Sequence, residues 1–158
     1  MTVRGGANDM HRDGLVADQG CKFLTGGGGE PLEQQGILVR RDRRRLESDI
    51  GHFFVIDNGQ NILGCAALYP YPVEKSAELA CLAVNPFYRD GGRGERLLAF
   101  AEARARSLGM KSLFVLSTRA THWFIERGFV EADIARLPEA RRSHYNVERR
   151  SKVFIKEL

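Results

Sequence analysis

The clearest chemical signal in the sequence is the segment 89–94, which reads R-D-G-G-R-G and follows an R-x-x-G-x-G pattern. It lies between an apolar run of strand length at 78–84 and a segment at 94–108 whose leucines and alanines recur at helical spacing. The N-terminus of a helix leaves backbone N–H groups unpaired and carries a partial positive charge, and glycine lets the backbone approach a phosphate. Arg89 and Arg93 add full charges that can pair with phosphate oxygens. The segment therefore predicts a pyrophosphate-binding loop at the start of the helix.

The spacing of this loop excludes two other kinds of phosphate-binding loop. No Gly-Lys-Ser/Thr follows it, as the loop of nucleoside triphosphatases requires. It also lacks the G-x-G-x-x-G spacing of dinucleotide-binding folds. An ordinary glycine turn is the alternative that the motif alone leaves open.

Length and composition indicate one globular domain of 158 residues, with 43% hydrophobic and 28% charged residues. A disordered chain, a collagen and a coiled coil are excluded. No apolar run approaches the roughly 18 residues of a membrane span, and no secretory signal is evident. The three cysteines lack the spacing of a zinc site or a disulfide framework. We expect a cytoplasmic protein that binds no metal and no membrane.

The elements expected along the chain begin after a glycine-rich, weakly ordered lead-in at 1–29 that holds one short strand near residues 2–4. The folded domain covers 30–158. Its first half is expected to contain a short amphipathic helix over 40–50, then a hairpin of strands at 53–57 and 62–69 around Asn58-Gly59, ended by Pro70 and Pro72.

The second half of the domain alternates strands and helices. We expect a strand at 78–84, the helix at 94–108, a strand at 112–116, a helix from Ser117 to Arg127, an extended piece from Phe129, and a last strand at 153–155. This order indicates an α/β protein (α+β with one mixed sheet) with helices packed on the sheet.

Six blocks in this order carry a resemblance to a known family: 33–41, 65–72, 78–89, 93–99, 113–129 and 137–145. Together they resemble the acetyltransferase domain of bacterial N-acetylglutamate synthases, a branch of the GNAT superfamily, over residues 30–158. The resemblance implies a single domain with the GNAT acyl-CoA N-acyltransferase fold. The family's usual form carries an amino-acid-kinase-like domain ahead of this one, for which the sequence has no counterpart.

The activity that the resemblance implies is transfer of acetyl from acetyl-CoA to the α-amine of L-glutamate, the first step of arginine biosynthesis. Direct attack by the amine needs a base for the ammonium and an acid for the leaving thiolate. The resemblance gives these roles to Glu78 and Ser117. From the residues alone, Glu78 could equally be a strand-end carboxylate, and Ser117 could equally be a helix N-cap. Tyr145 is an alternative acid, since many GNAT enzymes use a tyrosine.

The resemblance also implies which residues bind the cosubstrate acetyl-CoA and the acceptor. Backbone groups of Leu82, Ala83 and Val84 are expected to pair with the pantetheine arm, and the pyrophosphate is expected to lie against Arg89, Asp90, Gly91, Gly92, Arg93, Gly94 and Glu95. For a dicarboxylic acceptor the resemblance implies binding by Arg41, Cys81, Arg149 and Ser151. The other arginines of the runs at 40–45 and 141–150 are expected to be solvated.

Two other functions remain open at this stage. One is an acetyltransferase for another small amine, and the other is a non-catalytic module that binds acyl-CoA. We expect no nucleic-acid partner, because the net charge is only +4 and no nucleic-acid-binding motif accompanies the arginine runs. A homo-oligomer is expected on family grounds alone.

Overall fold

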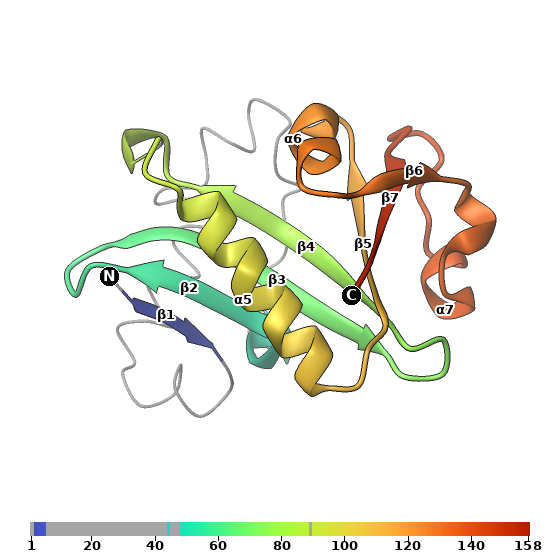
Figure 1. Cartoon of the computed structure of the whole chain (residues 1–158), viewed down its shortest axis with the longest axis horizontal. Helices are drawn as coiled ribbons and strands as arrows, with labels where there is room; N and C mark the ends of the chain where they lie inside the picture. Colours follow the sequence, from blue (N-terminus) through green and yellow to red (C-terminus); the bar gives the residue numbers. More distant parts are fainter. Residues whose placement is uncertain (1, 6–43, 45–47, 89) are drawn as a thin grey trace. The chain divides into compact units, whose positions relative to one another are not determined.

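The computed structural model describes residues 2–5, 44, 48–88 and 90–158 (Figure 1). Its elements in chain order are β1 (Thr2–Gly5), η1 (Ile50–His52), β2 (Phe53–Asp57), β3 (Ile62–Tyr71), β4 (Ser76–Val84), η2 (Pro86–Tyr88), α5 (Arg93–Ser107), β5 (Ser112–Ser117), α6 (Thr121–Glu126), β6 (Val130–Ala132), η3 (Ile134–Arg136), α7 (Glu139–Arg142) and β7 (Lys152–Glu157).

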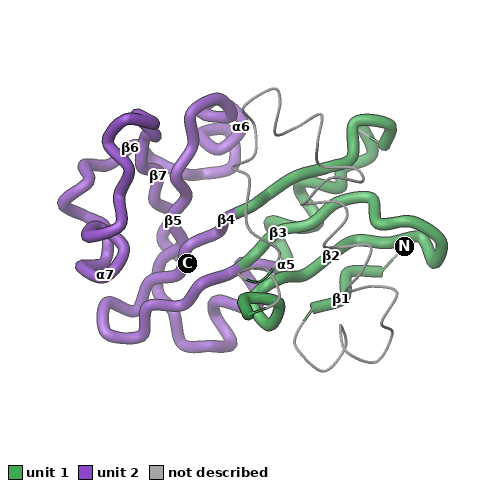
Figure 2. Tube along the Cα trace, turned by 180° about the vertical axis from the view of Figure 1, so that it is seen from behind, with its two compact units in different colours: residues 1–67, 81–100 green, residues 68–80, 101–158 purple. Residues whose placement is uncertain are grey.

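The strands form one mixed sheet in the order β1-β2-β3-β4-β5-β7-β6. β4 and β5 pair in parallel, whereas β1 with β2, β2 with β3, β5 with β7, and β6 with β7 pair antiparallel. The chain divides into two compact units, coloured separately in Figure 2. Unit 1 comprises 1–67 and 81–100, and unit 2 comprises 68–80 and 101–158.

Unit 1 is built on the hairpin of β2 and β3. Its turn holds Gly59 at a φ of +88°, a conformation that side chains rarely adopt, and the Asn58 side chain accepts the N–H groups of Gln60 and Asn61. β2 is buried along Phe53–Ile56, and the Phe54 ring lies 4.9 Å from that of Phe100 in α5. The helix is therefore held to the hairpin by aromatic packing.

Unit 2 is built on β5 and β7, which pair over six residues from Ser112↔Glu157 to Ser117↔Lys152. Its parallel ladder with β4 has three pairs and ends at Glu78↔Phe114. One face of this sheet carries a buried cluster of Phe114, Leu137, Val153 and Ile155, with Tyr71, Leu116, Ala132 and Tyr145 packed against it. The apolar strands thus bury a core beside Glu78.

Most of the expected elements are confirmed, including the short strand near residues 2–4, which pairs with β2 as β1. The expected end of a strand at Pro70 is wrong, because β3 continues to Tyr71. Proline loses only its own N–H and keeps a φ that an extended strand accepts. α7 was not expected from the sequence. The helix predicted over 40–50 and the boundary at residue 29 lie largely outside the described residues, although Arg44, Ser48 and Asp49 are helical.

Within the part of the chain that the structure describes, no helix is both long and apolar enough to cross a membrane.

Gly64 provides a test of packing in unit 1. A Cβ atom at this position would lie 2.9 Å from the Ala83 carbonyl oxygen and 3.1 Å from Leu97 Cδ1. Because backbone cannot easily move aside, we expect Gly64→Ala to lower the free energy of unfolding by about 1–3 kcal/mol. Urea denaturation measures this, with Gln60→Ala in the exposed turn as the control. Equal unfolding midpoints for the two variants would show that the strands accommodate the methyl group.

Candidate active site

The glycine-rich loop of unit 1 meets the N-terminus of α5. The Arg96 N–H donates to the Gly92 carbonyl oxygen at 3.1 Å, so the N–H groups of Arg93, Gly94 and Glu95 come before that bond of the helix. Gly92 and Asp90 both adopt a φ of +66°. Left-handed residues beside the start of a helix bring successive N–H groups to one side, as anion-binding loops do. The geometry suits the predicted pyrophosphate site.

Arg93 is bound to this loop in a way that the sequence did not predict. Its Nη1 donates to the Tyr88 carbonyl oxygen at 2.6 Å, and its guanidinium lies 5.8 Å from the centre of the Tyr88 ring. A Cβ atom at Gly91 would overlap Nη1, so this path of the side chain requires glycine at position 91. The Arg93 guanidinium therefore stabilises the loop through its contacts with Tyr88. Arg89 lies outside the described residues.

Cys81 is a point of backbone strain in β4. Its φ is +55°, a value that costs a residue with a side chain on the order of 1–3 kcal/mol. The Cys65 thiol lies 3.7 Å from the Cys81 carbonyl oxygen and donates to it. Burial raises the pKa of Cys65, which keeps it a thiol that can donate. The buried cysteine thus supports the strained residue immediately before Leu82, Ala83 and Val84.

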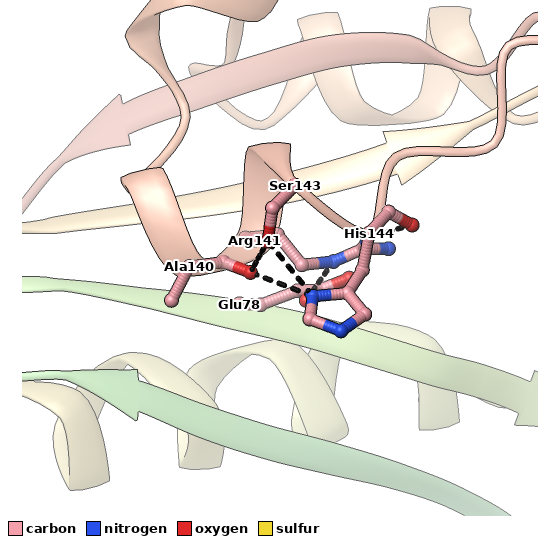
Figure 3. A network of polar contacts seen from close by, with 5 residues as sticks. All are labelled: Glu78, Ala140, Arg141, Ser143 and His144. Carbon is pink, nitrogen blue, oxygen red and sulfur yellow. Dashed lines mark hydrogen bonds and ion pairs between the residues drawn. The ribbon is translucent and has the colours of Figure 1, made fainter.

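Glu78 is one of the few polar residues buried in unit 2, with 7% of its surface exposed. Its Oε2 accepts a hydrogen bond from Arg141 Nε at 2.7 Å, which makes a charge-assisted ion pair (Figure 3). Arg141 Nη1 also donates to the His144 carbonyl oxygen at 3.2 Å. The carboxylate predicted to be the base is therefore held by a guanidinium that is itself anchored.

Tyr71, at the end of β3, is the second partner of Glu78. Burial, followed by the negative charge of Glu78, raises the pKa of Tyr71 to about 12, and a hydrogen bond to Glu78 adds to the shift. Its ring packs against Phe114, with centroids 5.8 Å apart. Tyr71 is thus a neutral donor to the carboxylate throughout the physiological range.

Ser117, the predicted acid, is the last residue of β5. Its Oγ accepts the Ala120 N–H at 3.2 Å, in a turn that leads into α6. This bond uses a lone pair of the oxygen and leaves the O–H able to donate. Phe114 is the ladder partner of Glu78, and Ser117 lies three residues beyond Phe114. About 10 Å of strand therefore separates Ser117 from the level of Glu78. Because side chains alternate along a strand, Ser117 belongs to the opposite face of the sheet.

The segment 145–151 adjoins Ser117, because Ser117 pairs with Lys152. The Tyr145 hydroxyl donates to the Ser151 carbonyl oxygen at 2.6 Å, so its proton is already engaged. Ser151 is buried at 7% exposure, whereas Arg149 is exposed, just before a turn residue, Arg150, with a φ of +52°. Two of the residues predicted to bind the acceptor therefore lie near the end of β5 that carries Ser117.

The predicted residues fall into the two units by role. All the described residues predicted to bind acetyl-CoA are in unit 1, together with Cys81; Glu78, Ser117, Arg149 and Ser151 are in unit 2. Arg41 lies outside the described residues. Sequence reasoning missed Arg141 and Tyr71. Arg141 is 63 positions from Glu78, which leaves no local pattern, and Tyr71 reaches Glu78 from the neighbouring strand β3. Over the described ranges, no cluster of three or more His, Cys, Asp or Glu side chains could hold a metal ion.

Comparisons with known proteins agree with this architecture. Residues 22–129 match the model of the acetyltransferase (GNAT) family. The chain is 59% identical over 128 residues to an amino-acid acetyltransferase of Azotobacter vinelandii, and 52% identical to one of Vibrio cholerae, each match covering 81% of this chain. A solved N-acetylglutamate synthase from Neisseria gonorrhoeae, complexed with coenzyme A and N-acetyl-glutamate, aligns over 99% of this chain with a TM-score of 0.83 and 39% identity.

The matches cover only part of those relatives. The chain spans 30% of the length of the Azotobacter protein, 29% of that of the Vibrio protein and 35% of the Neisseria chain. The fold expected from the sequence, and the resemblance on which it rested, are confirmed.

The ionisation of Tyr71 can be measured directly. Its raised pKa means that the phenol contributes to stability fully below pH 10, its ordinary pKa, and that the contribution is lost as the pH rises to about 12. We expect an ultraviolet titration of the four tyrosines to contain a late step near pH 12 that Tyr71→Phe removes and Tyr88→Phe retains. A Tyr71→Phe titration that keeps the late step would show that another residue is responsible.

Proposed function

Because the chain belongs to the acetyltransferase (GNAT) family, we propose that it is an N-acetyltransferase that moves acetyl from acetyl-CoA to the α-amine of L-glutamate. The observation that carries the proposal is on β4. This strand bears a buried, ion-paired carboxylate at Glu78 and, three residues later, the left-handed backbone at Cys81, and it leads through η2 to the loop at the start of α5. A general base and an anion-binding helix terminus are two of the parts that such a reaction needs, beside an acid for the leaving thiolate.

The choice of glutamate as acceptor is supported by the relatives. The two curated proteins are amino-acid acetyltransferases, and the Neisseria structure is a complex with coenzyme A and N-acetyl-glutamate. They are longer proteins, of which this chain corresponds to about a third. The proposal is that this part contains the acetyl-transfer site.

We assign the cosubstrate to the loop and the strand before it. The N–H groups of Arg93, Gly94 and Glu95, in the first turn of α5, would take the pyrophosphate, together with the backbone of Asp90, Gly91 and Gly92 and the charge of Arg89. The backbone of Leu82, Ala83 and Val84 would pair with the pantetheine arm. Bound there, acetyl-CoA supplies the activated acyl group as a thioester.

Proton transfer would begin at Glu78. A carboxylate has four lone-pair positions, and the donors Arg141 and Tyr71 use two of them, so acceptor capacity remains for an ammonium group or an intervening water. When Glu78 takes this proton, the amine lone pair can attack the thioester carbon. Collapse of the adduct breaks the carbon–sulfur bond, and the thiolate takes a proton from an acid. The second proton of the former amine then returns to that acid, which leaves a neutral amide and a free thiol.

Ser117 suits the role of that acid better than Tyr145. Each hydroxyl has one proton to give. That of Tyr145 is donated to the Ser151 carbonyl oxygen, whereas the bond of Ser117 with Ala120 uses an oxygen lone pair. Strands β4 and β5 pair only as far as Glu78. The side chains of Glu78 and Ser117 can therefore both contact one substrate that passes beyond the end of this ladder.

Recognition of two carboxylates is assigned to Arg41, Arg149 and Ser151, with the backbone of Cys81. Arg149 is exposed, and Ser151, two residues later, is buried beside the end of β5. A guanidinium and a hydroxyl of this kind are suitable partners for a carboxylate group.

The proposal predicts that the purified chain releases coenzyme A thiol from acetyl-CoA with L-glutamate, and much more slowly with a panel of other amino acids and amines. Glu78→Gln should lower kcat by about 10²–10⁴-fold, because the base is lost. Glu131→Gln, on an exposed carboxylate of β6, is the control. Faster release with another acceptor would overturn glutamate as substrate, and binding of acetyl-CoA without release would favour a non-catalytic module.

A second prediction concerns the acceptor carboxylates. We expect Arg149→Gln to raise the KM for glutamate at least tenfold and to leave the KM for acetyl-CoA within about twofold, since a lost charge-assisted bond is worth about 1.5–3 kcal/mol. Arg150→Gln, one residue along the same turn, is the matched control. Equal changes in the KM of both substrates would contradict a specific role in binding glutamate.

A further inference from the structure

We propose that Arg141 is a positioning residue for the reaction: its guanidinium fixes the Glu78 carboxylate in the orientation in which it accepts the proton of the substrate's ammonium group. The inference rests on the proposed function, since it assigns Arg141 a task only if Glu78 is the base. It adds to that function a residue on an element, α7, that the sequence did not predict.

The first argument is the geometry of the pair. Arg141 contacts Glu78 through Nε, at 2.7 Å, and its Nη1 donates to the His144 carbonyl oxygen at 3.2 Å. A guanidinium bound at two of its nitrogens is fixed in rotation, and so is the carboxylate oxygen that it holds. Lysine, with one flexible ammonium group, cannot make both contacts with the same directions.

The second argument is the anchoring of α7 itself. The Glu139 N–H, in the first turn, donates to the Glu74 carboxylate at 3.2 Å, and Leu137, just before the helix, is buried in the core cluster. After the helix, His144 Nδ1 lies 2.9 Å from the Ala140 carbonyl oxygen, which closes the last turn (Figure 3). Glu74 and Glu78, four residues apart, thus hold one short helix at two points.

The third argument is that Glu78 is enclosed by donors on two sides. Arg141 from α7 and Tyr71 from β3 both donate to it, and the side chains of Glu78 and Arg141 are 9% and 23% exposed. The charged and titratable groups that face the carboxylate are Arg141, Tyr71 and, further along the connection of β3 and β4, Glu74, with His144 beyond the guanidinium. Arg141 is the one positive charge in contact with Glu78 among the described residues, so its removal would leave the buried carboxylate without a positive partner.

The test compares Arg141→Lys, Arg141→Gln and the control Arg142→Gln, in which a neighbouring arginine of the same helix is replaced while Glu78 keeps its partner. We expect Arg141→Gln to lower kcat/KM for glutamate by about 10- to 100-fold and Arg141→Lys by less, with the KM for acetyl-CoA unchanged. Because the loss is in the handling of the acceptor and not in the cosubstrate site, kcat should fall more than the KM for either substrate changes in Arg141→Gln. The kcat/KM of Arg142→Gln should match that of the parent.

A double-variant experiment separates positioning from a structural role. If Arg141 acts through Glu78, then Arg141→Met should cost nothing further in a Glu78→Gln background, where the base is already absent. The double variant has no unpaired buried charge, so we expect it to fold normally. Circular dichroism checks this. An unchanged kcat/KM for glutamate in Arg141→Gln, or a full additional loss in the double variant, would overturn the inference and leave Glu78 as the base. A Glu78→Gln variant as active as the parent would overturn the base assignment and the inference together.

Discussion

The sheet of unit 2 has to accommodate one buried carboxylate, that of Glu78. Glu78 sits among apolar side chains with 7% of its surface exposed, and a charge in such a place needs a partner and further hydrogen bonds. Arg141 supplies the first and Tyr71 the second. To bring Arg141 there, the chain must place α7 over the face of β5 and β7 on which Phe114 and Ile155 lie, and it does so by burying Leu137 against them. The core and the ion pair therefore depend on each other.

The strand that carries Glu78 also sets up the proposed cosubstrate site. After Glu78, β4 reaches the left-handed Cys81, and after Val84 it ends at Asn85-Pro86, where η2 begins and the loop into α5 follows. Positive φ values recur at Asp90 and Gly92, next to the first hydrogen bond of the helix. Three residues with a positive φ, Cys81, Asp90 and Gly92, thus lie between Glu78 and the first turn of α5. Strain of this kind is tolerated where function holds it in place.

The parts of the fold predicted from the sequence are those set by neighbouring residues. Asn58-Gly59 fixes a hairpin, and glycines ahead of an amphipathic helix fix the loop, because each depends on backbone preferences within a few positions. Glu78 and Ser117 are assigned catalytic roles only through the family resemblance, since a carboxylate or hydroxyl at the end of a strand is common. Arg141 could not be assigned to Glu78, because 63 residues separate them and α7 has only four residues, too few for helical periodicity.

The alternation of side chains along β5 limits how the proposed chemistry can be arranged. Glu78 shares the face of Phe114, whereas Ser117, Lys152 and Lys156 belong to the other face, where Lys156 pairs with Glu102 of α5 at 2.6 Å. A base and an acid on opposite faces cannot both act on a substrate that lies flat on one face. Under the roles proposed for Glu78 and Ser117, the reacting group would have to be reached from both faces, which is possible only where strand pairing has stopped. The proposed mechanism therefore depends on the short ladder of β4 and β5, which ends at Glu78.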